Sequence, residues 1–357
     1  MYVKKLTMEG FRNYKTECFT FSPETNLIYG NNAQGKTNAL EAIYLFSIGK
    51  SFRTQQDREL IHFQEDQTKI CVVFENHLRE NEIELVLRRD KKKQIKINGV
   101  PIQKMGELIG LFTVVLFSPD ELNLTKGSPY ARRRFLDIAV SQMRPKYYHI
   151  LRRYNKTLEQ RNNLIKKLRF TNDESLKDTL CIWNEKLAEY GMTVITYRKK
   201  FVESLQAFSK KIHHEISGDM FEVRYKTAFE TKEQFVEKLN ASLSKEIEQG
   251  FTLYGPHRDD LEIEINGKDI KVYGSQGQHR SAVLALKLAQ ADMMYEDTGE
   301  YPVLLLDDIM SELDKERREY LAVKIKNKQV IITCTDVDDL PENSSTQMIR
   351  IANGKIV

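Results

Sequence analysis

The chain has 357 residues, of which 41% are hydrophobic and 30% are charged, and its formal net charge is +4. This length suggests two or three domains, and the apolar content is enough for a core, which excludes global disorder. No run approaches the roughly eighteen apolar residues of a membrane span, and residues 1–6 lack a signal-peptide region, so we expect a cytoplasmic protein. The four cysteines form no CxxC pair and predict neither a zinc site nor a disulfide framework.

The positive charge is concentrated in the middle of the chain. Residues 121–213 hold 20 Lys and Arg against 9 Asp and Glu, a local net of +11, so the rest of the chain carries −7. A basic middle between acidic flanks indicates a polyanion partner. A solvated, lysine-rich helical surface is the plain structural alternative.

Residues 1–120 alternate short strands with one helix. Residues 27–29 form an apolar strand that leads into a glycine loop, and residues 36–48 follow with helical spacing. Further strands are predicted at residues 70–74, 83–87, 95–97 and 113–117, and Asn98-Gly99 favours a hairpin turn.

The predicted secondary structure changes twice in the rest of the chain. Over residues 121–250 strand signals vanish, and the apolar spacing of residues 147–168 and 176–216 predicts an all-helical arm of antiparallel helices. After Gly250 the predicted elements are a strand at 261–265 that turns and continues through 270–273, a helix at 278–294, a buried strand at 303–306, a helix at 311–325, a buried strand at 330–333 and a closing hairpin at 347–357. Strands that alternate with helices imply a largely parallel sheet, and hence an α/β fold.

The strongest motif is the loop between the first apolar strand and the first helix. It reads Gly30-Asn31-Asn32-Ala33-Gln34-Gly35-Lys36-Thr37, followed by Asn38, and matches the phosphate-binding pattern G-x-x-x-x-G-K-[ST]. The glycines let backbone N–H groups approach phosphates, Lys36 can reach the β- and γ-phosphates, and the Thr37 hydroxyl can bind Mg²⁺. The sequence therefore predicts ATP and Mg²⁺ as ligands.

Two acids end a buried strand far along the chain. Residues 303–306 are apolar, and Asp307 and Asp308 follow them at the carboxyl end of the strand, where ligands gather in such sheets. Asp307 is the candidate for Mg²⁺, and Asp308 for orienting or deprotonating the attacking water. Capping of the next helix is the alternative for this pair.

A second anion site is predicted where Ser275-Gln276-Gly277-Gln278 precedes a long helix. A hydroxyl, free N–H groups and a helix N-terminus suit a phosphate, although an ordinary N-cap explains the serine equally well. Three arginines, Arg132 to Arg134, open the basic segment, and Arg152 and Arg153 lie further along it. They are candidates for DNA phosphates, and the first three could instead pair with head carboxylates as a hinge.

Together these motifs resemble the RecF family of SMC-like, ABC-type ATPases. Residues 275–278 look like the signature motif and residues 311–314 like the D-loop, while residues 6–14 resemble the opening of such proteins, where Arg12 would lie near the nucleotide. Residues 117–119, 132–137 and 255–260 are also similar to segments of the family. The resemblance implies an ABC-type head with a mixed sheet, built from residues 1–120 and 251–357, and an inserted arm at residues 121–250.

The resemblance also implies a mechanism. In such heads the phosphate loop of one subunit and the signature of another enclose one ATP, so ATP drives dimerisation and hydrolysis releases the dimer. Ser275, Gly277 and Gln278 would then contact the ATP held by the partner's copy of the phosphate loop. Family members act in recombinational repair at DNA gaps and junctions, where with RecO and RecR they help to load the recombinase RecA. A weak, DNA-stimulated ATPase that is associated with the nucleoid is implied.

Three positions depart from the wider ABC pattern. Asp308 stands where transporter-type heads carry glutamate, and its shorter reach predicts slow turnover. Cys334-Thr335 replaces the usual switch histidine after residues 330–333, so we expect a hydroxyl to sense the γ-phosphate. No glutamine is placed as a Q-loop after residues 113–117.

Three other classes fit less well. A membrane-transport ATPase subunit would carry a shorter, less basic insertion, and a chromosome-structural SMC or Rad-type protein would carry heptads over hundreds of residues. A P-loop kinase would need neither residues 275–278 nor residues 311–314.

Overall fold

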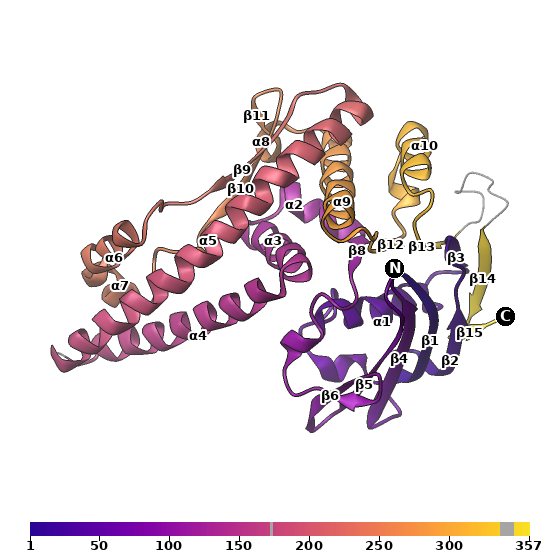
Figure 1. Ribbon diagram of the computed structural model, residues 1–357, viewed down its shortest axis with the longest axis horizontal. Helices are drawn as coiled ribbons and strands as arrows, with labels where there is room; N and C mark the ends of the chain where they lie inside the picture. Colours follow the sequence, from indigo (N-terminus) through magenta and orange to yellow (C-terminus); the bar gives the residue numbers. More distant parts are fainter. Residues whose placement is uncertain (172–173, 336–345) are drawn as a thin grey trace. The chain divides into compact units, whose positions relative to one another are not determined.

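The computed structural model describes residues 1–171, 174–335 and 346–357 (Figure 1). The chain divides into two compact units. Unit 1 comprises Met1–Leu122, Lys211–Gly218 and Gln276–Val357, and unit 2 comprises Asn123–Lys210 and Asp219–Ser275. The second boundary thus falls after Ser275, whereas the sequence suggested residue 250.

Unit 1 contains two six-stranded sheets, and their strands come from both ends of the chain. Its strands are β1 (Tyr2–Phe11), β2 (Tyr14–Thr20), β3 (Thr25–Tyr29), β4 (Gln67–Glu75), β5 (Glu80–Arg88), β6 (Lys91–Ile97), β7 (Val100–Pro101), β8 (Val114–Phe117), β12 (Val303–Asp307), β13 (Val330–Cys334), β14 (Gln347–Ala352) and β15 (Lys355–Ile356). Its helices are α1 (Lys36–Ile48), the last turns of α5 (Glu174–Ser217), α9 (Gln276–Thr298) and α10 (Lys315–Lys324), with 3₁₀ turns at Asp57–Leu60, Met105–Glu107, Pro119–Leu122 and Met310–Glu312.

The two sheets of unit 1 have different characters. The first is antiparallel, in the order β2-β1-β4-β5-β6-β7, and the second, β15-β14-β3-β13-β12-β8, is parallel from β14 to β8. Every residue of β12 and β13 is buried, as expected for the interior of a parallel sheet. The alternation of strands and helices therefore predicted this sheet correctly.

Helix α1 lies in the core that the two sheets share. Apolar residues of α1 join one buried cluster with residues of β1, β4 and β5 from the first sheet and of β8, β12 and β13 from the second. Because α1 is covered on nearly all sides, even its Glu41 is fully buried. This burial fixes the start of the helix, where the phosphate-binding motif lies.

Unit 2 is mostly helical but carries a small sheet. Its elements are α2 (Asn123–Lys126), α3 (Pro129–Met143), α4 (Pro145–Leu168), most of α5 (Glu174–Ser217), β9 (Phe221–Lys226), α6 (Lys232–Ala241), α7 (Leu243–Gln249), β10 (Asp260–Ile265), β11 (Lys268–Asp269) and α8 (Ile270–Tyr273). Helices α4 and α5 lie side by side and share a small core of Ile165, Leu168 and Leu180 (Figure 1).

Two predicted elements of this region were wrong. The segment expected to be all-helical contains β9, in which buried Phe221 and Val223 alternate with exposed residues and which pairs antiparallel with β10. Residues 270–273 form the helix α8 and do not continue the strand. The Asp269 carboxylate accepts a hydrogen bond from the Lys271 N–H at 2.8 Å, and this N-cap starts a helical turn.

Candidate nucleotide site

The phosphate-binding loop has the predicted setting of strand, loop and helix. It leaves β3 at Gly30 and enters α1 at Lys36, and the Lys36 ammonium donates hydrogen bonds to the carbonyl oxygens of Gly30, at 2.6 Å, and Asn31, at 2.9 Å. Burial lowers the pKa of Lys36, and the nearby carboxylates of Asp308 and Asp307 oppose this shift. Lys36 is therefore a partly desolvated cation that an anionic ligand would satisfy.

The two predicted metal ligands lie next to each other. The Thr37 hydroxyl, on the first turn of α1, donates to Asp307 Oδ1 at 2.8 Å. Thr333, on the neighbouring strand β13, donates its hydroxyl to the same oxygen at 2.8 Å. Burial raises the pKa of Asp307, and the hydrogen bonds from these hydroxyls offset only part of this shift. Two residues separated by most of the chain are thus brought into one oxygen-lined site.

Asp308, the candidate for orienting water, is held differently. It is exposed, and its φ of 51° is in the left-handed region that side chains other than glycine rarely adopt. Its N–H donates to the Thr333 hydroxyl at 3.0 Å, and its carbonyl accepts from Ser311 at 2.9 Å. Thr333 therefore contacts both acids. It supplies a hydroxyl at the end of β13, two residues before Thr335, where the sequence had suggested one.

Sequence reasoning missed the residues that brace the loop from outside. The Asn13 amide donates to the Gln34 carbonyl at 2.8 Å, and the Tyr14 hydroxyl donates to the Gly35 carbonyl at 2.9 Å. From the other end of the chain, the Gly354 N–H donates to the Gln34 carbonyl at 3.1 Å. The only sequence signal for this bracing was the family-like segment around Asn13.

The close packing around the loop requires glycine at positions 30 and 35. A Cβ on Gly30 would lie 2.3 Å from the Ile351 carbonyl oxygen, and one on Gly35 would lie 2.8 Å from the Asn13 amide. Their φ values of 148° and 117° also exclude ordinary side chains. The glycines thus serve the packing of the loop as well as any phosphate that enters it.

Arg12 lies beside the loop but is bonded to a carboxylate of α1. Its guanidinium donates to both oxygens of Glu41, at 2.7 and 2.9 Å. Arg53, which the sequence motifs did not single out, donates to Asn38 at 2.7 Å and lies 3.4 Å from Glu41. The structure therefore gathers two arginines near the start of α1.

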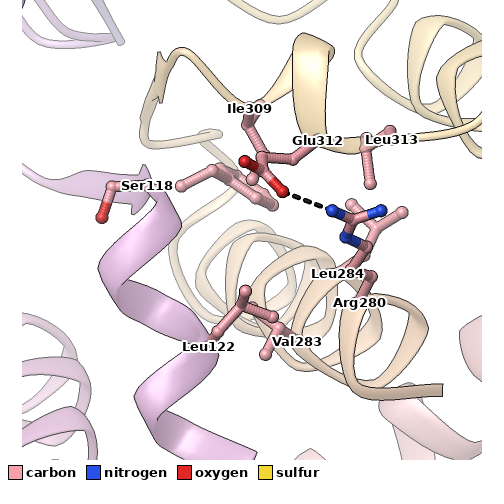
Figure 2. Close-up of a pocket in the computed structure, with 9 residues that line it drawn as sticks. Ser118, Leu122, Arg280, Val283, Leu284, Ile309, Glu312 and Leu313 are labelled. Carbon is pink, nitrogen blue, oxygen red and sulfur yellow. Dashed lines mark hydrogen bonds and ion pairs between the residues drawn. The ribbon is translucent and has the colours of Figure 1, made fainter. Parts of the chain in front are cut away.

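The signature-like residues lie at the beginning of α9. Ser275 precedes the helix, and Gly277 and Gln278 belong to its first turn. Further along α9, Arg280 forms an ion pair with Glu312 of the D-loop segment. Figure 2 shows this pair beside an apolar pocket whose lining includes Val283 and Leu313. The pocket lies between α9, the end of β8 and residues 309–313.

The predicted DNA-binding arginines fall into two groups within unit 2. Arg132 is buried, forms two hydrogen bonds with the Asp260 carboxylate at 2.7 and 2.8 Å, and so is not available to a DNA phosphate. Arg133 donates to the Asp259 carbonyl at 2.8 Å, and Arg134 is half-buried. By contrast, Arg152 and Arg153 on α4 are exposed. The alternative of pairing with a carboxylate thus holds for Arg132, but its partner Asp260, which the sequence assigned to the head, belongs to unit 2.

Within the described ranges of the chain, no cluster of three or more His, Cys, Asp or Glu side chains could hold a metal ion. The predicted Mg²⁺ site would use one hydroxyl and one carboxylate of the protein together with phosphate oxygens and water. The same ranges contain no helix long and apolar enough to cross a membrane.

The fold and the site define a P-loop ATPase head of the SMC type. The family model described as the RecF/RecN/SMC N terminal domain matches residues 2–356. The chain is 42% identical to a DNA replication and repair protein RecF of Acetivibrio thermocellus, with 99% of each chain covered, and 42% identical to one of Clostridium perfringens, with 100% of this chain and 99% of the relative covered.

Solved structures agree with these relatives. A structure of the recombination mediator protein RecF-ATP in the RecFOR pathway is 38% identical, has a TM-score of 0.92, and is matched over 100% of this chain and 97% of its own. An Smc head bound to the C-winged helix domain of ScpA is 18% identical with a TM-score of 0.59, which supports the fold alone. The chain belongs to the RecF family.

Proposed function

We propose that this protein binds ATP and DNA in recombinational repair and replication-fork maintenance, with ATP as the switch between monomer and dimer. The observation that carries the proposal is the 2.8 Å hydrogen bond between Thr37 Oγ1 and Asp307 Oδ1, beside Lys36 in its glycine loop. It joins the two halves of a phosphate and metal site whose motifs lie at opposite ends of the chain. Relatives described as RecF in its ATP-bound form support ATP as the nucleotide.

Residues 30–38 would hold the phosphates of ATP, with Lys36 as the cation. Thr37 and Asp307 fit Mg²⁺, because hydroxyl and carboxylate oxygens are the ligands that this ion prefers. Thr333 would keep the Asp307 carboxylate oriented from outside the metal's ligand shell. The metal would neutralise charge on the phosphates.

Ser275, Gly277 and Gln278 would serve the ATP of a second copy of the chain. They lie at the N-terminus of a 23-residue helix, where the helix dipole and the backbone N–H groups of the first turn favour an anion. The family resemblance supports a sandwich in which each site takes the loop of one chain and the signature of the other. Two bound ATP molecules would then link two chains into a dimer that holds DNA.

Asp308 would orient the attacking water, and hydrolysis would release the dimer. The carboxylate is shorter than the glutamate of transporter-type heads, which supports slow turnover suited to a switch. DNA bound in the dimer would stimulate this weak activity. A wild-type turnover of many ATP per second without partners would contradict the proposal.

The DNA-binding surface would include helix α4. Its exposed cations are Lys146, Arg152, Arg153, Lys156, Lys166 and Lys167, followed by Arg169 just beyond its end, and its exposed acid is Glu159. Such a helix suits the phosphate backbone of single-stranded or duplex DNA at gaps and junctions. The names of the relatives and their RecFOR pathway support RecO and RecR as partners. Loading of RecA as the outcome rests on the family resemblance alone.

The test is sedimentation velocity of the full chain with and without ATP and duplex DNA. The wild-type chain and Asp308→Asn should dimerise with ATP, and the variant dimer should persist because hydrolysis is blocked. Thr37→Val, which loses the metal-facing hydroxyl, should remain monomeric. An Asp308→Asn variant that stays monomeric at saturating ATP would rule out the sandwich.

A further inference from the structure

Glu41 is a fully buried carboxylate with more cationic partners than its own charge can balance. Its Oε1 accepts from Arg12 Nη2 at 2.7 Å and from the Ser51 hydroxyl, and its Oε2 accepts from Arg12 Nε at 2.9 Å. Arg53 Nη1 lies 3.4 Å from Oε2. The two-pronged pairing with Arg12 is the geometry in which a guanidinium is held most firmly.

Arg53 is also connected to the phosphate-binding loop. Arg53 donates to the Asn38 side chain at 2.7 Å, and Asn38 donates to Asn13 at 2.8 Å. Asn13 in turn donates to the Gln34 carbonyl at 2.8 Å. A continuous chain of hydrogen bonds therefore connects Glu41, through Arg53, to the loop itself.

The backbone turn at Arg12 also supports the phosphate-binding loop. Its φ of 52° is a conformation that side chains other than glycine rarely adopt, and such strain persists where the surroundings hold it. The turn that contains Arg12 also supplies Asn13 and Tyr14 to the loop. One short turn thus fixes the loop with two side chains and places a guanidinium with the third.

The two arginines remain partly exposed beside the loop. Two guanidiniums share one carboxylate, and their side chains are 20% and 42% exposed for Arg12 and Arg53. Arg53 also acts on the proposed metal ligand, since burial raises the pKa of Asp307 whereas the charge of Arg53 lowers it. An incoming anion could therefore pair with these partly exposed guanidiniums.

We propose that Glu41 is a positioning residue, which holds Arg12 and Arg53 in place beside the phosphate-binding loop before ATP arrives. The inference rests on the proposed ATP binding and adds a residue that touches no nucleotide. Orientation in advance saves the cost of ordering two long side chains on binding.

The test is Glu41→Gln in the full chain, with the dissociation constants of ATP, ADP and adenosine measured by calorimetry. The glutamine keeps the shape but loses the charge and one acceptor, so ATP and ADP should bind about tenfold more weakly while adenosine is unaffected. Glu41→Asp, which keeps the charge at a shorter reach, should fall between the wild type and Glu41→Gln.

The matched control is Glu246→Gln. Glu246 is equally buried and pairs with Arg161 at 2.7 Å in unit 2. The same substitution therefore removes a buried ion pair, and neither of its residues is predicted to contact the nucleotide. It should lower the unfolding temperature and leave ATP affinity unchanged. A purely structural Glu41 would give the same pattern as Glu246.

A double-mutant cycle with Arg12→Gln separates the two explanations further. If Glu41 acts through Arg12, the second substitution should add little to the loss of ATP affinity caused by the first. Wild-type affinity in folded Glu41→Gln, or fully additive losses in the cycle, would overturn the inference. A wild-type chain that binds no ATP would instead overturn the proposed function.

Discussion

Thr333 shows how one hydroxyl can organise two catalytic candidates. It donates to the Asp307 carboxylate and accepts from the Asp308 N–H. A hydroxyl both donates and accepts, so no apolar residue of the same shape could link the two acids. The position lies at the end of β13, close to where a hydroxyl was expected in place of the switch histidine.

We predict that Thr333→Val lowers the ATP turnover number about tenfold, since a lost hydrogen bond to a charged group costs about 1.5–3 kcal/mol. The ATP dissociation constant should change by less than about threefold, because the phosphate loop is untouched. Steady-state hydrolysis and calorimetry measure the two quantities. Thr68→Val is the control, because buried Thr68 donates to the Glu9 carbonyl, at 2.8 Å, in the first sheet. Equal losses in both variants would contradict the assignment.

His257 has a structural role in unit 2. Its Nδ1 lies 2.5 Å from the Tyr154 hydroxyl, and burial lowers its pKa to about 4. The folded pKa lies below the ordinary value of 6.5, so the unfolded chain binds more protons between these values and stability falls as the pH falls through that window.

The free energy of unfolding should therefore drop by about 2 kcal/mol from this group between pH 7 and pH 5. Urea unfolding of the wild type and of His257→Gln at both pH values measures it. The variant should be less stable at pH 7 but should show the smaller drop. An unchanged drop in the variant would assign the pH dependence to other groups.

At the scale of elements, polar pairs join helix α9 to the segment after β12. Arg280 pairs with Glu312 beside the apolar pocket of Figure 2, and Arg317 at the start of α10 donates to Ser281 at 2.8 Å. Partly exposed pairs of this kind add about 0–1 kcal/mol to stability. Their value would lie in fixing the D-loop segment relative to the signature helix.

Arg280→Ala and Glu312→Ala should each lower ATP turnover about fivefold with little change in unfolding temperature, and the double variant should be no worse than either single one. The turnover loss would follow from a D-loop, and hence an Asp308, that is less well placed. The pair Lys315–Glu319, on the surface of α10, provides the control, and its alanine variants should turn over ATP normally. Additive losses would exclude coupling.

The helices of unit 2 separate buried from exposed arginines. On α3 Arg132 is committed to Asp260, whereas Arg152 and Arg153 on α4 are exposed. Charge counting along the sequence could not make this distinction, because it depends on which face of each helix is packed.

Replacing Arg152 and Arg153 with glutamine should weaken DNA binding and reduce the slope of log affinity against log salt by about 0.9 for each phosphate that is no longer neutralised. Fluorescence anisotropy at several salt concentrations measures the slope. Arg224→Gln is the control, because Arg224 is also exposed in unit 2 but pairs with Glu222 and Glu264. A slope that the double variant leaves unchanged would remove α4 from the DNA-binding surface.

At the scale of the whole molecule, the nucleotide site depends on both chain ends. The turn before β2, the loop before α1 and the hairpin between β14 and β15 meet through Asn13, Gln34 and Gly354. The hairpin was predicted from Asn353-Gly354, but nothing in the sequence placed it against the loop.

ADP, which should bind without dimerising the chain, is expected to slow hydrogen exchange together in residues 10–14, 30–38 and 351–354. Bound ligand stabilises the folded state by about 2.7 kcal/mol at a hundred times its dissociation constant, and the three segments are joined by hydrogen bonds. Mass spectrometry of exchanged peptides measures the effect. The hairpin at residues 96–101 should not change. Slower exchange in residues 30–38 without any change in residues 351–354 would show that the bracing is not coupled to the ligand.

The sequence by itself determined the motif chemistry and most of the elements. The loop from Gly30 to Thr37 and the acids after residue 306 follow from local patterns of glycine, apolar runs and charge, which require only neighbouring residues. The wrong predictions for β9 and α8 also have local causes. The alternation of buried and exposed residues in β9 is short, and the N-cap at Asp269 is a single residue, so both signals were weaker than the longer helix and strand patterns around them.

Only the tertiary structure decided which residues meet. The hydrogen bond of Thr37 with Asp307, the bracing of the loop by Asn13 and Gly354, and the sharing of Glu41 by Arg12 and Arg53 all join residues that no spacing rule relates. The packing of unit 2 likewise pairs the buried Arg132 side chain with the Asp260 carboxylate. Such pairings arise from the order of strands in the sheets and from helix packing, which depend on the whole chain because each sheet combines segments from far apart.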